Sequence, residues 1–393
     1  MHPPKTFLAV LVTLFLLLMV THPSAIYQGA VSGIDIWWRI VFPSLLPFFI
    51  VTELLLSLGA VHFLGALLEP LTRKVFRLPG AAAFGIAVGF TSGYPMGAAI
   101  AARLKVEGLL SPLDAARLAA FANNASPLFI LVAVAVGMFR NSQLGSYLAA
   151  IHYGSNILTG LTLTLFARPL PSSPVNPWRQ AIRTLAVTQH GDPRNIGRLT
   201  ADAVRHAVKN LFTILGFICL FAVVLQLFGA VSFLRDITEI LKHLFEKTGL
   251  PSSLWPAVSA GLFEITLGTK MAAEADASLN QRIMVTVAIL SWGGLSGVLQ
   301  ALSFLAAAKI PGGLFLLGRG LQVGYACALT ATVSSYFVPR ITHAVATTAT
   351  PELSFTTLLI GATLSSLAAI LGLLIVGLFT ALGPCQVICR RRR

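Results

Sequence analysis

Long apolar runs recur along the whole chain and are separated by short polar segments. Each run approaches the ~20 residues that an α-helix needs to cross a bilayer. The runs cover residues 7–26, 37–58, 81–102, 119–139, 144–166, 208–229, 254–271, 283–308, 312–337 and 354–382. This pattern predicts an all-α polytopic membrane protein. The alternative, the buried core of a soluble protein, does not account for runs of this length over the full chain.

The composition supports the same class of protein. The chain has 393 residues, of which 56% are hydrophobic and 11% are charged, and its mean hydropathy is +0.82. Soluble globular proteins are about one quarter charged. We therefore expect the lipid bilayer to be the main surrounding of this chain.

The net charge of +14 comes mostly from basic residues in the short segments between apolar runs. Because such residues favour the cytoplasmic side, Arg73, Lys74, Arg103, Lys105 and the run Arg390–Arg393 are all expected there. Both termini are then cytoplasmic. The basic residues form no stripe interleaved with aromatic residues, so we expect no nucleic-acid partner.

Two of the apolar runs agree with this preference of basic residues for the cytoplasmic side, called the charge rule below, only if they do not cross the membrane. Full crossings throughout would place Arg103 and Lys105 on the opposite side from Arg73 and Lys74. A re-entrant hairpin over 81–102 removes the conflict, and run 254–271 behaves in the same way. The segment before it, 230–253, mixes acidic and basic residues and is typical of an amphipathic helix at the outer interface. The prediction is about eight spanning helices and two re-entrant helical hairpins.

The order of these elements repeats with opposite orientation in the two halves. Such an inverted repeat is a common plan of secondary transporters. The predicted units are an N-terminal anchor or signal-like helix (1–36), a first repeat (37–166), a basic cytoplasmic linker (167–207), a second inverted repeat (208–337), and a C-terminal helix with a basic tail (338–393). We favour an uncleaved anchor over a signal peptide, because Pro23 spoils the cleavage pattern.

The stretch "GFTSGYPMGA", residues 89–98, places helix breakers within an apolar run. Irregular backbone is tolerated at membrane depth only where protein or a wet cavity surrounds it. We interpret the stretch as a hairpin tip whose amides and polar groups bind a solute. The expected binding residues are Thr91, Ser92, Gly93 and Tyr94. The alternative is a glycine-kinked helix packed against its neighbours.

The stretch "FANNASPLFI", residues 121–130, places two carboxamides and a proline within another run. A buried carboxamide without partners is costly, so these groups need a ligand or a neighbouring helix. We expect a broken helix with Asn123, Asn124 and Ser126 at the site. Hydrogen bonding between helices, or a helix start at Asn123, would explain the same residues.

The second half offers counterparts in "GLFEITLGTK" (261–270) and "SWGGLSGVLQ" (291–300). They predict a second tip with Glu264 and Thr266 and a second break with Ser291 and Ser296. An ionisable group at membrane depth is a functional candidate, and its surroundings favour the neutral carboxyl. Glu264 is therefore the expected site of proton coupling, and an ion pair with Lys270 is the structural alternative.

Other buried polar residues are weaker candidates. We expect His152 to be a core histidine and Glu53 to be an interfacial carboxylate. Arg319 could face the cavity or the cytoplasmic mouth, and Gln322 could face the cavity. The chain has no HExxH, GxSxG or Walker A sequence and no convincing metal-site spacing, so we expect neither an enzyme nor a bound metal or cofactor. The expected coupling ion is H⁺ or Na⁺.

The segments "GFTSGYPMGAAIAARL", "FANNASPLFI" and "GLFEITLGT" resemble those of the YlbJ-type sporulation integral membrane proteins, which belong with the nucleoside-recognition, or gate, domain proteins. The resemblance covers most of the chain, from the second apolar run to the last. It implies a fold similar to concentrative nucleoside transporters, with two opposed hairpins and two broken helices. It assigns residues 92–95, Asn123, Asn124, Ser126, Glu264 and Thr266 to the tips and the first break, and Ser291 and Ser296 more loosely to the second break.

The resemblance also implies a function, namely movement of dipicolinic acid across the outer forespore membrane. The expectation is a secondary transporter of a small anionic heterocycle. Two alternatives stay open: a nucleoside or nucleobase transporter, and a non-transporting assembly protein of the spore envelope. A homo-oligomer is compatible with each of these functions.

Overall fold

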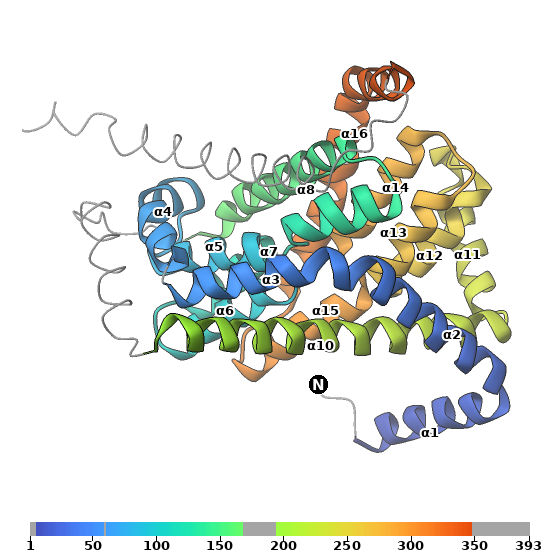
Figure 1. Cartoon of the computed structure of the whole chain (residues 1–393), viewed down its shortest axis with the longest axis horizontal. Helices are drawn as coiled ribbons and strands as arrows, with labels where there is room; N and C mark the ends of the chain where they lie inside the picture. Colours follow the sequence, from blue (N-terminus) through green and yellow to red (C-terminus); the bar gives the residue numbers. More distant parts are fainter. Residues whose placement is uncertain (1–4, 59, 168–193, 348–393) are drawn as a thin grey trace, which may run out of the picture.

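The computed structural model describes residues 5–58, 60–167 and 194–347, and every regular element within them is a helix (Figure 1). The elements are α1 (Lys5–Thr21), α2 (Pro23–Ile36), η1 (Trp37–Val41), α3 (Phe42–Ser57), α4 (Ala60–Phe76), α5 (Ala82–Ser92), α6 (Met96–Val106), α7 (Pro112–Ala122), η2 (Phe129–Met138), α8 (Gln143–Thr162), η3 (Leu163–Phe166), α10 (Ile196–Ala230), α11 (Phe233–Leu244), η4 (Glu246–Thr248), η5 (Ser252–Leu254), α12 (Trp255–Phe263), α13 (Ile265–Glu274), α14 (Leu279–Trp292), α15 (Gly294–Ala307) and α16 (Gly313–Thr347). The predicted all-α class is confirmed. The predicted run 354–382, the basic tail and most of the basic linker lie outside the described residues.

Several helices are long and apolar enough to cross a membrane. Within the described residues these are Ile196–Ala230, Leu279–Ala307 and Gly313–Val333, and a bent pair, Val12–Thr21 with Pro23–Val41, meets the same criteria at an angle of 99°. Their length and composition fit the predicted class of membrane protein. The figure of about eight spans stays a prediction, because most of the other runs are divided into shorter helices.

The N-terminal region differs from the expected separation into two spans. Residues 27–36, between the apolar runs 7–26 and 37–58, were expected to link them, but α2 covers that segment and continues through the π-helical η1 into α3. Gly29 and Gly33 let α2 approach the backbone of α10 at Val223 and Cys219. Figure 1 shows α2 and α3 running along α10, with α1 set apart from the bundle. A hydropathy pattern does not reveal that α2 packs along α10, since this contact depends on Gly29 and Gly33.

Both predicted hairpins are present. Between α5 and α6 the chain leaves the helical conformation at residues 93–95, and Gly89 and Gly97 both face the carbonyl of Ala122. Two positions equally far from Gly93 can meet one carbonyl only if the chain doubles back. In the second hairpin, Gly268 of α13 lies against Gly261 of α12.

Both predicted helix breaks are present as well. Residues 123–126 separate α7 from the helical turn that leads into η2, and Gly293 separates α14 from α15. Together with the hairpins, they place one tip and one break in each half of the chain.

Some element boundaries differ from the sequence-based division. Residues 207 and 337, two expected domain ends, lie inside α10 and α16, and residues 60–76 form α4 where no helix was expected. The division into domains itself stays a prediction. The segment 230–253 does contain the expected amphipathic helix, α11, which has no buried residue.

Candidate functional site

The tips of the two hairpins and the two helix breaks lie against one another. Gly93 of the first tip has a φ of +83°, and a side chain there would meet Ser126 of the first break. The ring of Tyr94 lies against Gly293 of the second break, where φ is +87°. Gly294, with a φ of +65°, lies against Glu264 of the second tip. Since only glycine adopts these conformations readily, the glycines allow four distant segments to meet in one place.

A cavity of about 460 Å³ opens at this meeting point. Both tips, both breaks, α3 and α10 contribute to its walls. Of the residues expected at the site, those that line it are Thr91, Ser92, Gly93, Tyr94, Ser126, Glu264, Thr266 and Ser296. The volume lies within the ~300–1,000 Å³ that is usual for small-molecule sites.

Four helices start beside the cavity. They are α6 at Met96, the helix after the first break, α13 at Ile265 and α15 at Gly294. The first amides after the break are partly satisfied by Ser126, whose Oγ accepts from the Phe129 N–H at 3.2 Å. The start of α13 is capped by the side chain of Glu264. Because helix N-termini carry unpaired N–H groups and partial positive charge, the other three starts favour a negatively charged group beside them.

The first tip presents several polar groups to the cavity. The Thr91 hydroxyl donates to the Ala87 carbonyl at 2.8 Å, and the Tyr94 hydroxyl donates to the Leu290 carbonyl at 2.9 Å. The buried Ser92 hydroxyl has no hydrogen-bond partner among the described residues. A buried hydroxyl without a partner is costly, so Ser92 is available to a solute.

Glu264 is 4% exposed and caps the N-terminus of α13. Its carboxylate accepts from the Leu267 N–H at 2.8 Å and from the Thr266 hydroxyl at 3.1 Å. The alternative of an ion pair with Lys270 is not realised, since the hydrogen-bond partners of Glu264 in the described part of the chain are these two neighbours. Among the described residues, the structure therefore places at the cavity wall a carboxyl that has no basic partner.

Three of the expected residues do not line the cavity. The Asn123 carboxamide accepts from the Ala98 N–H at 3.4 Å, and the Asn124 carboxamide accepts from Asn156. Ser291 is buried at the end of α14. The contacts of Asn123 and Asn124 match the alternative of bonding between helices. A direct role of all three residues in substrate binding stays a prediction.

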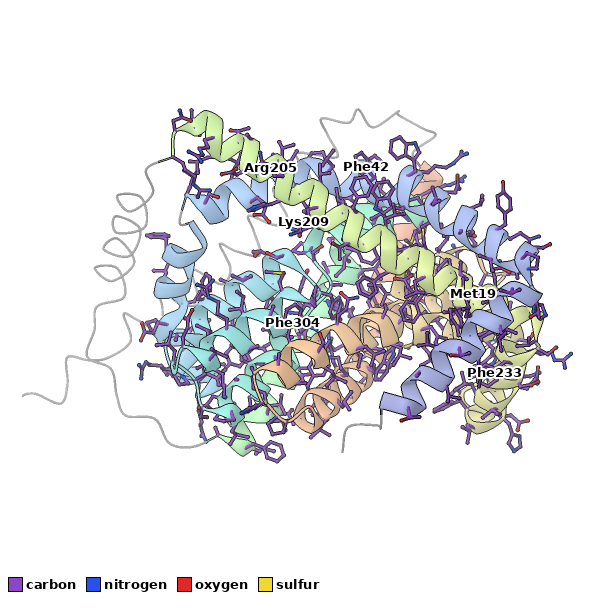
Figure 2. All side chains as sticks on the ribbon, turned by 90° about the horizontal axis from the view of Figure 1, so that it is seen from below. Met19, Phe42, Arg205, Lys209, Phe233 and Phe304 are labelled. Carbon is purple, nitrogen blue, oxygen red and sulfur yellow. The ribbon has the colours of Figure 1, made fainter. Side chains whose placement is uncertain are left out.

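Where exposed residues line the cavity, at its mouth, α3 and α10 contribute charged side chains. Glu53 lies 3.5 Å from His206 Nδ1 and accepts from Asn210 at 3.4 Å. Lys209 also lines the mouth and is exposed on α10, where Figure 2 labels it. Glu53 was expected to be an interfacial carboxylate, and the structure places it at the cavity mouth.

The sequence did not assign a definite place to Arg319. Its side chain is completely buried and lies behind Tyr94, not at a mouth. It donates to the Tyr94 hydroxyl at 3.1 Å, to the Ser291 carbonyl at 3.2 Å and to the Ala120 carbonyl. The signal that could have found it is an arginine within an apolar run, which by itself marks a candidate site.

His152 and Gln322 lie deeper in the bundle. Both are completely buried, and Gln322 donates to the His152 carbonyl at 3.5 Å. The ring of His152 accepts from the Ala125 N–H at 3.3 Å, as expected for a core histidine.

Several known proteins are similar to parts of this chain. A family model described as "Gate: Nucleoside recognition" matches residues 38–142, which include the first hairpin and the first break. The structure of a CNTnw variant in the intermediate 3 state covers 86% of this chain and 88% of its own, at 13% identity and a TM-score of 0.47. A doubly substituted CNTnw in an outward-facing state covers 83% and 85%, at 12% identity and a TM-score of 0.43.

A curated relative matches over most of both chains. The sporulation integral membrane protein YlbJ of Bacillus subtilis (strain 168) is 38% identical over 320 residues, which are 78% of this chain and 77% of the relative. None of these similar proteins is named as an enzyme. The chain is therefore an integral membrane protein, and it belongs to the family of the sporulation integral membrane protein YlbJ.

Proposed function

We propose that this chain is a secondary transporter of a small anionic heterocycle, and that the substrate is dipicolinic acid moved during spore formation. One observation carries the proposal: the cavity lies where two hairpin tips and two helix breaks meet. Secondary transporters bind solutes at such discontinuous helices, whose N-termini point at anionic groups.

The walls suit a flat, negatively charged molecule. The N-terminal ends of α6, α15 and the helix after the first break, together with the Ser92 hydroxyl, can hold carboxylate oxygens. Phe49, Phe129 and Phe217 supply apolar surface for a ring. Lys209 at the mouth attracts the anion as it enters.

Glu264 gives a reason for coupling to protons. An ionised carboxylate beside the cavity repels an anionic solute, and a neutral carboxyl does not. We therefore assign proton coupling to Glu264, so that a proton enters with each anion.

The direction in which the cavity opens follows from the positions of the basic segments. Its mouth lies along the first half of α10, which follows the basic linker that is expected in the cytoplasm. We therefore propose that this conformation is open to the cytoplasm and that both termini lie on that side. The name of the relative YlbJ supports a role in sporulation, and we propose the outer forespore membrane as the location.

A nucleoside is the second candidate substrate, because the family model that matches residues 38–142 is described as nucleoside recognition. The test is uptake by the purified chain in liposomes, with labelled dipicolinate and labelled uridine, with and without a proton gradient. The proposal expects dipicolinate uptake that rises when the outside is acidified, and unlabelled dipicolinate that competes better than uridine. Preferential uridine uptake would favour the nucleoside carrier. No flux of either solute would favour the assembly protein of the spore envelope.

A further inference from the structure

Arg319 joins segments from both halves of the chain. It extends from α16, where Gly318 allows close approach to Ala120 of α7. Its guanidinium contacts Ala120 of α7, Ser291 of α14 and Tyr94 of the first tip. The described residues therefore provide it with two carbonyls and a phenol as acceptors, and not with a carboxylate.

Both carbonyls belong to the last turn of a helix that stops at a break. The last four carbonyls of a helix lack intrahelical partners, and each helix C-terminus carries about half a negative charge. α7 ends at Ala122 and α14 ends at Trp292, so Ala120 and Ser291 are within these last turns. One buried guanidinium therefore balances two helix C-termini that point at it.

In secondary transporters the unwound carbonyls and helix C-termini at such breaks coordinate the coupling cation. We propose that Arg319 is a built-in counter-ion that takes the place of an inorganic cation at both helix breaks, so that transport by this chain requires no sodium. The proposal deepens the proposed function, because it assigns the charge balance of the same site.

Tyr94 connects this counter-ion to the cavity. Its hydroxyl accepts from Arg319, donates to the Leu290 carbonyl, and belongs to a residue of the cavity wall. The guanidinium thus holds the first hairpin tip against the second break, with the positive helix ends facing the cavity and two negative ends facing Arg319.

Arg117 provides a matched control. It is also buried, and it donates to the carbonyls of Leu163, Arg77 and Phe76. In contrast to Arg319 it has its own carboxylate, Asp114, at 3.2 Å, and it does not line the cavity or contact a break.

The test compares thermal unfolding of the purified full chain in sodium chloride and in choline chloride at equal concentration, with and without methylguanidinium. The wild type is expected to unfold at the same temperature in both salts. Arg319→Met is expected to unfold several degrees lower and to regain part of the loss in sodium or methylguanidinium. Arg117→Met is expected to be destabilised with no recovery specific to either cation. Arg319→Lys, which keeps the charge, is expected to unfold between wild type and Arg319→Met and to remain insensitive to sodium.

Three results would overturn the proposal: a wild type that is stabilised by sodium over choline, an Arg319→Met variant as stable as wild type, or an Arg319→Met variant that recovers with neither cation. If Arg319→Met cannot be purified, a sodium-dependent Arg319→Lys variant would overturn it as well. These measurements need no substrate, so their failure is separate from a failure of the proposed transport function.

Discussion

Single residues decide the charge inside the cavity, and Glu264 is the first of them. Glu264→Gln should keep most of the cap on α13, at a cost of about 1 kcal/mol, because a carboxamide oxygen still accepts a hydrogen bond. It cannot release or bind a proton. We expect uptake that no longer responds to a proton gradient while exchange of substrate continues. Glu274→Gln, at the exposed end of α13, is the control. An unchanged gradient response in Glu264→Gln would contradict the assignment.

Lys209 should act on entry of the anion. Removing its charge in Lys209→Met is expected to raise the KM for the anion roughly 3- to 10-fold, and to weaken the dependence of uptake on ionic strength, because steering by an exposed charge is screened by salt. The measurement is uptake at several substrate and salt concentrations. Lys242→Met, on the exposed face of α11, should behave as wild type. Equal KM values for the two variants would exclude this role.

The sequence predicted some of these residues better than others. Ser92, Glu264 and Ser296 were predicted because polar groups are expected to face a cavity where a membrane helix is interrupted. The structure places all three at the cavity. The roles of Asn123 and Asn124 were ambiguous, because a ligand or another helix can equally satisfy the hydrogen bonds of a carboxamide. Arg319 was not placed, because its acceptors come from α7 and α14 and only the folded structure brings these helices together.

Among the elements, the first hairpin depends on close backbone contact. A methyl group on Gly97 would overlap the carbonyl of Ala122, which is backbone and cannot easily move. Gly97→Ala is therefore expected to lower stability by about 1–3 kcal/mol, as overpacking does. Thermal unfolding measures the effect. Gly216→Ala is the matched control, since nothing lies within 4 Å of its added methyl. A Gly97→Ala variant as stable as Gly216→Ala would contradict the packing described for this hairpin.

The hairpins and breaks were predictable as elements, because glycine, proline and asparagine within an apolar run disfavour a continuous helix. The boundaries of the long helices were not. α10 starts before its apolar run, with Asn195 as cap and Leu199, Ala203 and Ala207 on a buried face. An amphipathic turn of this kind resembles a linker in a hydropathy pattern. The sequence of α4 is amphipathic as well, and it resembles a linker for the same reason.

At the scale of the whole molecule, the charge rule and the apolar runs together predicted two hairpins that enter without crossing. The meeting of both tips and both breaks at one cavity then follows from folding the two halves against each other. The side on which the cavity opens depends on α10 and α3, whose contact could not be derived from hydropathy.

Solute is expected to pass through this cavity. Ser296 lies on its wall near the start of α15, and Ser303, seven residues later on the same helix, is exposed. Uptake of labelled dipicolinate into liposomes should be compared for wild type, Ser296→Trp and Ser303→Trp, after equal yields of folded protein are verified. We expect uptake by wild type and Ser303→Trp, and at least ~10-fold less by Ser296→Trp because the indole fills the binding space. Equal uptake by all three proteins would contradict the claim.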